Sequence, residues 1–172
     1  ACKPSPLLNS SQSTTLCVEH SFEILSSPYK APHSFLQTEL AETCAPAHHN
    51  LSLLAYGVLN GGALTGKYLD GTAEPNARFN FAPKFQPRYR GLAAAAATRE
   101  YVAIAKEAGV SPAVLAQAWA YSRHYMGAVI IGATSIAQLE SNWAAADVQL
   151  GEVLLKKIDD VHIRRRNPNC DD

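Results

Sequence analysis

Two short runs of uncharged apolar residues place the strongest limit on the fold of this chain. One lies in residues 51–59 and contains Leu53-Leu54-Ala55-Tyr56, and the other is Ala128-Val129-Ile130-Ile131-Gly132. Such runs are typical of strands buried on both faces, as in a parallel sheet covered by helices. We therefore expect a parallel sheet, not a set of hairpins.

Helical patterns separate and follow these two strands. Residues 92–108 are rich in alanine and end at Gly109, and Ser111-Pro112 gives a strong start signal for a helix to about residue 124. Thr134 or Ser135 caps another helix, and a last helix covers about 152–165. The apolar residues that we expect on the faces of the two middle helices are Val114, Leu115, Ala118 and Trp119, then Ile136, Leu139 and Trp143.

The first part of the chain gives weaker signals. Residues 1–19 are rich in Ser, Thr, Asn and Pro and are expected to form a disordered or divergent tail, so that the ordered domain is 20–172. A short strand at 20–26 and a helix at 34–45 are expected to follow. Residues 70–90 form a long irregular stretch with three prolines, and a loop of this length usually has a function.

Strands that alternate with helices indicate βαβ units and an α/β fold. A complete (β/α)8 barrel needs roughly 250 residues. At about 30 residues for each βα unit, the 172 residues correspond to roughly half to two-thirds of one. The expected fold is therefore an incomplete (β/α)8 TIM barrel, whose open edges and bare apolar face favour self-association or pairing with another segment.

Composition excludes several classes of partner. Fifteen basic and fifteen acidic residues cancel, so no net field attracts nucleic acid or an anionic membrane. No apolar run approaches the length of a membrane span. The cysteines, which form no C-x-x-C pair and predict no metal site, are Cys2, Cys17, Cys44 and Cys170. Reduced thiols favour a cytoplasmic location, with an organelle left open. The cluster Arg164-Arg165-Arg166 is expected to be a solvated helix end.

The segment after the first apolar run is the first candidate site. Gly57, Gly61, Gly62 and Gly66 let the backbone approach an anion, and Lys67 adds a positive charge. Gly61 to Lys67 matches most of a P-loop, but Tyr68 stands where that motif needs a hydroxyl ligand for magnesium. A glycine-rich turn with a surface lysine is the alternative.

The second candidate follows the other apolar run. Gly132 ends the strand, and a hydroxyl-capped helix start offers free N–H groups and the positive end of a helix dipole. Thr134, Gln138 and Asn142 are four residues apart and share one helix face. An ordinary N-cap with a polar outer face is the alternative. The two candidates together match the phosphate site that barrels commonly form after their last two strands.

These segments resemble a known family. Leu53-Leu54-Ala55-Tyr56 with Gly62-Ala63-Leu64-Thr65-Gly66-Lys67-Tyr68 is similar to the seventh-strand segment of aldo-keto reductases, in the branch that includes potassium-channel β subunits. Ile130-Ile131-Gly132-Ala133-Thr134-Ser135 with Gln138 and Asn142 is similar to the eighth. Gly109 to Trp119 also fits the family pattern, and the resemblance covers roughly residues 35–168.

The resemblance implies NADP(H) as cofactor and reduction of a small aldehyde or ketone by hydride transfer. By position, the expected cofactor-binding residues are Tyr56, Gly57, Val58, Leu59, Asn60, Gly61, Lys67, Arg78, Gly132, Thr134, Gln138 and Asn142. Gly57-Val58 departs from the Ser-Pro of the family, and Ser26-Ser27-Pro28-Tyr29 resembles an altered end of its sixth strand.

The family's catalytic Asp, Tyr, Lys and His come from the first half of its barrel, and nothing in residues 1–19 matches them. We therefore assign no catalytic residue, and expect this chain alone to be inactive. Three hypotheses follow: a truncated portion of an NADP-dependent reductase, a non-catalytic nucleotide-binding or regulatory half-barrel, and a nonfunctional remnant.

Overall fold

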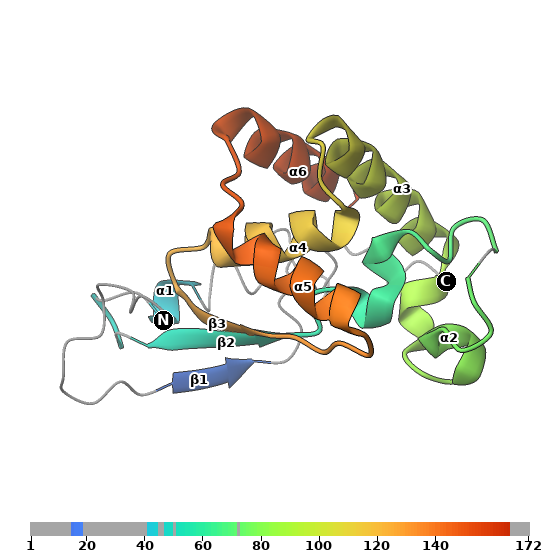
Figure 1. The fold of residues 1–172 in the computed structure, drawn as a ribbon. Coiled ribbons are helices and arrows are strands. Elements are labelled where there is room, and N and C mark those ends of the chain that lie inside the picture. The colour runs from blue at the N-terminus through green and yellow to red at the C-terminus, as the bar shows by residue number, and fades with distance from the viewer. Residues whose placement is uncertain (1–14, 19–40, 45–46, 50, 72, 166–172) are drawn as a thin grey trace.

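The structure is a computed structural model that describes residues 15–18, 41–44, 47–49, 51–71 and 73–165. Its described strands are β1 (Thr15–Val18), β2 (Ser52–Tyr56) and β3 (Met126–Ile130), and they form one sheet in the order β1-β2-β3 (Figure 1). Both strand pairs are parallel, so the expected parallel sheet is confirmed. Strand β3 corresponds to the apolar run that starts at Ala128, and it begins two residues before that run, at Met126.

The register of the sheet aligns the ends of its strands. Ala55 of β2 lies opposite Val18 of β1 and Val129 of β3, and Tyr56 lies opposite Ile130. Leu53 and Ala55 are buried while Ser52, Leu54 and Tyr56 are half-buried, which is the two-residue period of a strand with one covered face.

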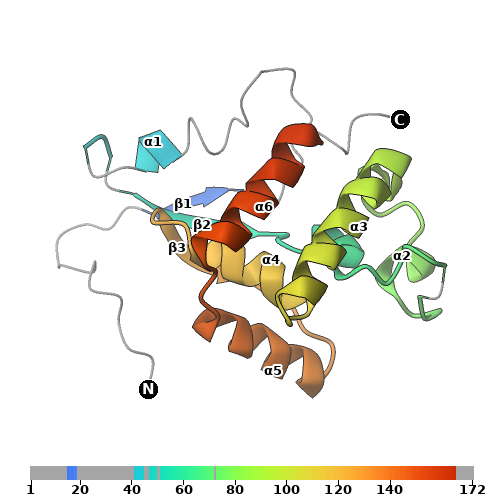
Figure 2. The same cartoon turned by 90° about the horizontal axis from the view of Figure 1, so that it is seen from above.

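Helices cover one face of the sheet. In chain order the helical elements are α1 (Ala41–Cys44), η3 (Asn60–Thr65), α2 (Arg78–Phe81), η4 (Pro87–Arg90), α3 (Leu92–Glu107), α4 (Pro112–Tyr121), α5 (Ile136–Ala144), η5 (Ala145–Asp147) and α6 (Glu152–Arg164). Helix α4 lies on the sheet and separates α5 from the pair α3 and α6 (Figure 2). Helices α3, α4, α5 and α6 confirm the helices expected in these places.

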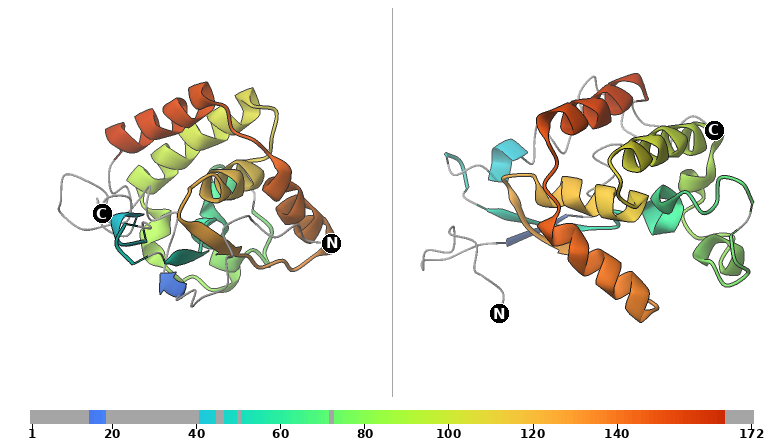
Figure 3. Two further views of the ribbon diagram at one scale, coloured as in Figure 1. Left: turned by 90° about the vertical axis from the view of Figure 1, so that its left-hand side faces the viewer. Right: turned by 45° about the horizontal axis from the view of Figure 1, so that its top comes forward.

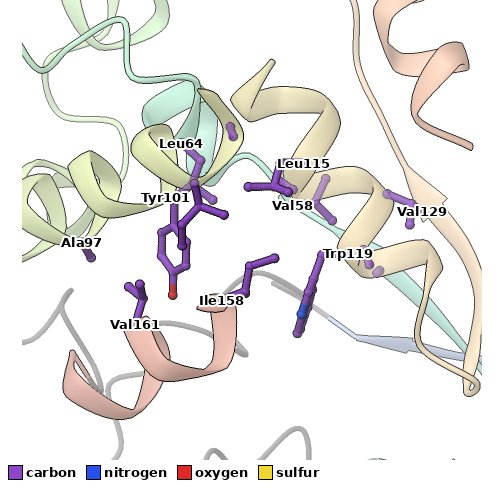
Figure 4. Close-up of a cluster of buried hydrophobic side chains, with 14 residues drawn as sticks. Val58, Leu64, Ala97, Tyr101, Leu115, Trp119, Val129, Ile158 and Val161 are labelled. Atoms are coloured by element: carbon purple, nitrogen blue, oxygen red, sulfur yellow. The ribbon is translucent and has the colours of Figure 1, made fainter. Parts of the chain in front are cut away.

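The main core lies where α4 meets the sheet, α3 and α6. Trp119 is fully buried at its centre, with Val129 of β3 and Ile158 of α6 among its members (Figure 4). All seven residues from Val114 to Ala120 are buried, so the expected inward face of α4 is confirmed and extends around the helix. Burial of this kind supplies most of the stability of a domain.

Two expectations for the first part of the chain need comment. The tail expected at 1–19 is wrong for residues 15–18, because these form β1 and pair with β2 along its length. The serines and threonines that indicated a tail precede a short run, Leu16-Cys17-Val18, that is apolar enough for a strand. The strand expected at 20–26, and the part of the expected helix before α1, lie outside the described residues.

Candidate functional site

The two candidate segments leave the same edge of the sheet. Tyr56 and Ile130 are the last residues of neighbouring parallel strands and lie opposite each other. Gly57 and Ile131 follow directly, so the glycine-rich loop after β2 and the loop before α5 start side by side. The carboxyl edge of a parallel sheet is where α/β proteins bind ligands. The fold therefore brings together two loops that lie about seventy residues apart in the sequence.

The loop after β2 has an unusual backbone. Gly57, Asn60, Gly61 and Gly62 have φ values of 70°, 49°, 65° and 99°, in the left-handed region. Glycine enters this region without cost and asparagine at little cost, so the sequence Asn-Gly-Gly permits three such residues in succession. The turn is closed by bonds from the amides of Asn60 and Gly62 to the carbonyls of Gly57 and Leu59, both at 2.8 Å.

Lys67 folds back towards this turn. A Cβ atom on Gly62 would lie 3.3 Å from Lys67 Cε and 3.4 Å from its Nζ, so the end of the lysine side chain lies close to this glycine. The ammonium group also lies 5.1 Å from the centroid of the Tyr68 ring, within the range of a cation–π contact. Lys67 is exposed, and its charge is therefore available beside the glycine turn.

The long irregular stretch packs onto the same turn and carries Arg78 to it. A Cβ on Gly61 would lie 3.0 Å from a ring carbon of Phe85 and 3.1 Å from one of Phe79. Phe79 stacks on Tyr68 at 4.5 Å between centroids, and the Arg78 guanidinium lies 5.2 Å from the centroid of Phe85. Residues 60–91 contain five basic residues and two acidic ones, so this segment has the charge that suits an anion.

Asn60 is the buried polar group of the turn. Its side chain is only 6% exposed, and no described residue hydrogen-bonds its Oδ1. A buried carbonyl oxygen without a partner is costly, and such atoms usually await a water molecule or a ligand. The oxygen is an acceptor, and it therefore suits a hydroxyl or amino group better than a phosphate.

The start of α5 is closed by its own side chains. Ser135 is the N-cap, and its Oγ accepts from the amide of Gln138 at 3.2 Å. The Gln138 Oε1 accepts from the amide of Thr134 at 2.9 Å and from its hydroxyl at 3.1 Å. This arrangement resembles a capping box shifted by one residue. Thr134 and Gln138 thus lie together, as their four-residue spacing predicts, and they hydrogen-bond each other while both side chains are exposed.

Asn142 is buried, whereas Thr134 and Gln138 are exposed. It is 5% exposed, and its Oδ1 accepts from Nε2 of the fully buried Gln117 on α4 at 2.7 Å. Its Nδ2 donates to the carbonyl of Gly132 at 3.5 Å. Asn142 therefore ties the end of β3 to α4. Gly132 itself is open, since a Cβ there would meet no atom within 4 Å.

Residues 8–163 match the aldo/keto reductase family. The chain belongs to this family. The match begins inside the segment expected to be a tail, in agreement with β1. Protein tas of Escherichia coli is 33% identical over 138 residues, which cover 80% of this chain and 39% of that protein. An aldo-keto reductase of Babesia bovis is 34% identical over 132 residues, or 74% and 46% of the two chains.

The resemblance to the potassium-channel branch is also confirmed. An Arabidopsis thaliana protein named "Probable voltage-gated potassium channel subunit beta" is 33% identical over 123 residues, which cover 66% of this chain and 36% of that one. Among solved structures, the glycerol dehydrogenase of Gluconobacter oxydans superposes with a TM-score of 0.57 and 27% identity. The match covers 78% of this chain and 40% of that one, so the aldo/keto reductase chain has the fold of part of a (β/α)8 barrel.

This aldo/keto reductase chain spans about two fifths of the length of the curated relatives that it matches, from 36% to 46% for the three named above. No helix in the described part of the chain is long and apolar enough to cross a membrane. Within the same part, no group of three or more His, Cys, Asp and Glu side chains could hold a metal ion.

The sequence interpretation missed the side chains that support the site. Gln117 is the one polar residue in the buried run 114–120, and an isolated polar residue in an apolar helix face is a signal for a buried hydrogen bond. The contacts of Phe79 and Phe85 with Gly61 carry no such signal, because the sequence around them shows no hydrophobic period, although Phe79 lies in the short helix α2. Ser26 to Tyr29, expected to correspond to the family's sixth strand end, lie outside the described residues.

Proposed function

We propose that this chain supplies the NADP(H)-binding part of an aldo/keto reductase that reduces an aldehyde or a ketone. The observation that carries the proposal is the meeting, at one sheet edge, of a left-handed glycine turn and the start of a serine-capped helix. Backbone amides and a helix dipole at such a place bind phosphate groups in many proteins.

The described residues fit a dinucleotide phosphate. Lys67 and Arg78 flank the glycine turn with positive charge. The pyrophosphate would lie along residues 56–61, within reach of these two cations. Thr134 and Gln138 would contact the adenosine side, where Gly132 leaves open space.

Asn142 enters this proposal as a positioning residue. Its amide is engaged by Gln117 and by the Gly132 carbonyl, so it fixes the loop that carries Gly132 and Thr134. A nucleotide contact from Asn142 would have to compete with the 2.7 Å bond to Gln117.

A bound NADPH would supply the hydride for carbonyl reduction. The side chains described here bind and orient, and none is assigned the role of proton donor. We propose that the residues that protonate and orient the carbonyl come from the remaining part of the family's barrel, which makes this chain inactive by itself. Hydride transfer to a carbonyl is severely slowed when the site has no proton donor.

Titration of the purified chain with NADPH and NADH, followed by calorimetry, tests the proposal. We expect preferential binding of NADPH. Lys67→Gln should weaken it roughly ten- to a hundredfold, because one charged contact to a phosphate contributes roughly 1.5–3 kcal/mol. Lys106→Gln is the matched control, because Lys106 is exposed near the end of α3. The proposal is contradicted if the folded chain binds neither nucleotide. It is also contradicted if the Lys67→Gln variant binds NADPH as tightly as the Lys106→Gln variant does.

A further inference from the structure

Gln117 is a fully buried polar residue in an otherwise apolar stretch of α4, from Val114 to Ala120. Its Nε2 donates to Asn142 Oδ1 at 2.7 Å, but no described residue hydrogen-bonds its Oε1. A buried carbonyl oxygen without a donor is costly, and such a group in a folded protein usually has a reason other than stability. That reason is to be sought in the residue that Gln117 does bind, Asn142.

The amide group of Asn142 is held at both ends. Its Nδ2 donates to the carbonyl of Gly132 at 3.5 Å, just after the end of β3, while its Oδ1 accepts from Gln117. Turning the amide over would bring Oδ1 against the carbonyl oxygen of Gly132, and two acceptors form no hydrogen bond. Asn142 therefore points into the contact between α5 and α4, although α5 itself projects from the body of the structure (Figure 3).

Gln138, one turn earlier on α5, also uses its carbonyl within the chain. Its Oε1 accepts from both the amide and the hydroxyl of Thr134, at 2.9 and 3.1 Å. A carbonyl oxygen has two lone pairs, so both are occupied here. The remaining polar group of the exposed Gln138 side chain is Nε2, which only donates. The carbonyl oxygens of both amide side chains are thus engaged by donors of the chain itself.

This arrangement bears on which base of a nucleotide the start of α5 accepts. Asparagine and glutamine recognise adenine by a pair of hydrogen bonds, in which the side-chain carbonyl accepts from the 6-amino group and the side-chain amide donates to a ring nitrogen. Neither Gln138 nor Asn142 presents a carbonyl for that pair. The hydroxyls of Thr134 and Ser141 can each donate or accept, so they do not distinguish an amino group from a carbonyl group.

We propose that Gln117 is a positioning residue that makes the nucleotide site unselective for the base. By holding Asn142 inward, it leaves the site without an amide carbonyl for the 6-amino group of adenine. This proposal takes the adenosine side of the nucleotide to lie at the start of α5, and so rests on the proposed function. An analogue of NADPH that carries hypoxanthine in place of adenine should therefore bind as tightly as NADPH.

Calorimetric titration of the purified chain with NADPH and with the hypoxanthine analogue, in which a carbonyl oxygen replaces the 6-amino group, tests the proposal. We expect the two dissociation constants to agree within about twofold. Gln117→Met keeps the length of the side chain and removes its donor. Asn142 Oδ1 then lacks its partner on α4, so it turns towards the nucleotide and accepts from the amino group. This variant should bind NADPH about three- to tenfold more tightly than the analogue.

Thr98→Val is the matched control, because Thr98 is also buried and its hydroxyl donates to the carbonyl of Ala94 within α3. This variant should lose stability and leave the ratio of the two dissociation constants unchanged. If the unmodified chain binds NADPH more than about twofold more tightly than the analogue, the proposal is overturned without any variant. A folded Gln117→Met variant that binds both alike overturns it as well. A folded chain that does not bind NADPH would instead contradict the proposed function, and this proposal with it.

Discussion

Helices α4 and α5 begin alike and end in opposite environments. Each has a serine N-cap whose Oγ accepts from an amide three residues later at 3.2 Å, Ser111 from Val114 and Ser135 from Gln138. Yet α4 is buried on nearly every side, whereas most of α5 is exposed, including its three large apolar residues. Local sequence therefore starts a helix, while the elements around the helix decide which of its faces is buried.

The two tryptophans give the largest expected contrast between the packed side and the open side. Trp119 on α4 is fully buried, so Trp119→Ala should lower the free energy of unfolding by about 3–5 kcal/mol. Trp143 on α5 is 75% exposed, and Trp143→Ala should change it by less than about 0.5 kcal/mol. Urea denaturation followed by circular dichroism measures both. Equal losses for the two variants would mean that the side chain of Trp143 is covered in this chain.

The next contrast is between two polar side chains of α5. Asn142→Ala should cost about 1–3 kcal/mol, because it leaves the amide of the fully buried Gln117 without its acceptor. Gln138→Ala, on the exposed side of the same helix, should cost much less and should weaken NADPH binding instead. Denaturation and calorimetry separate the two effects.

A double-mutant cycle with Gln117→Ala checks the Asn142 prediction. The double variant should lose less stability than the sum of the two single losses, since each variant breaks the same hydrogen bond. Additive losses would show that the 2.7 Å contact contributes nothing and that Asn142 is free to bind a ligand.

The sequence predicts the packed side of this molecule better than the open side. Pro112 after Ser111, the alanine-rich stretch of α3 and the uncharged strands are local signals, and the structure confirms them. The strand β1 was missed because four residues are too short for a periodic signal and follow a serine-rich stretch. The inward turn of Asn142 was missed since its partner lies 25 residues away on another helix.

Gly66 and Gly132 differ in how much space surrounds their backbone. Gly66 has a φ of 82°, and a Cβ there would lie 2.8 Å from Val102 Cγ2 on α3. Gly66→Ala should therefore cost roughly 1–2 kcal/mol of stability. Gly132 lies beside α5 in open space, and Gly132→Ala should cost less than about 0.5 kcal/mol. If Gly132→Ala greatly lowers the free energy of unfolding in denaturation experiments, another segment packs against the loop before α5.

Two glutamates give the smallest contrast, and it depends on pH. Glu100 on α3 accepts from Arg164 Nη2 at 2.6 Å and from Arg165 Nε, beyond the end of α6. These hydrogen bonds, that from Arg164 first, lower the pKa of Glu100 below its usual range. Arg164 and Arg165 of the basic cluster thus form ion pairs with α3, which the sequence could not show because Glu100 lies 64 residues before Arg164.

The lowered pKa fixes the sign of the effect. A carboxylate whose folded pKa lies below its unfolded value adds stability above the unfolded pKa, and this contribution is lost as the pH falls through the folded pKa. Glu100→Gln should therefore cost about 0.5–1 kcal/mol at neutral pH, since the pair is partly exposed, and the difference from wild type should vanish in acid. Glu140→Gln on the exposed face of α5 should change little at either pH. If the Glu100 variant loses the same stability at every pH, the missing contact is one of packing and not of charge.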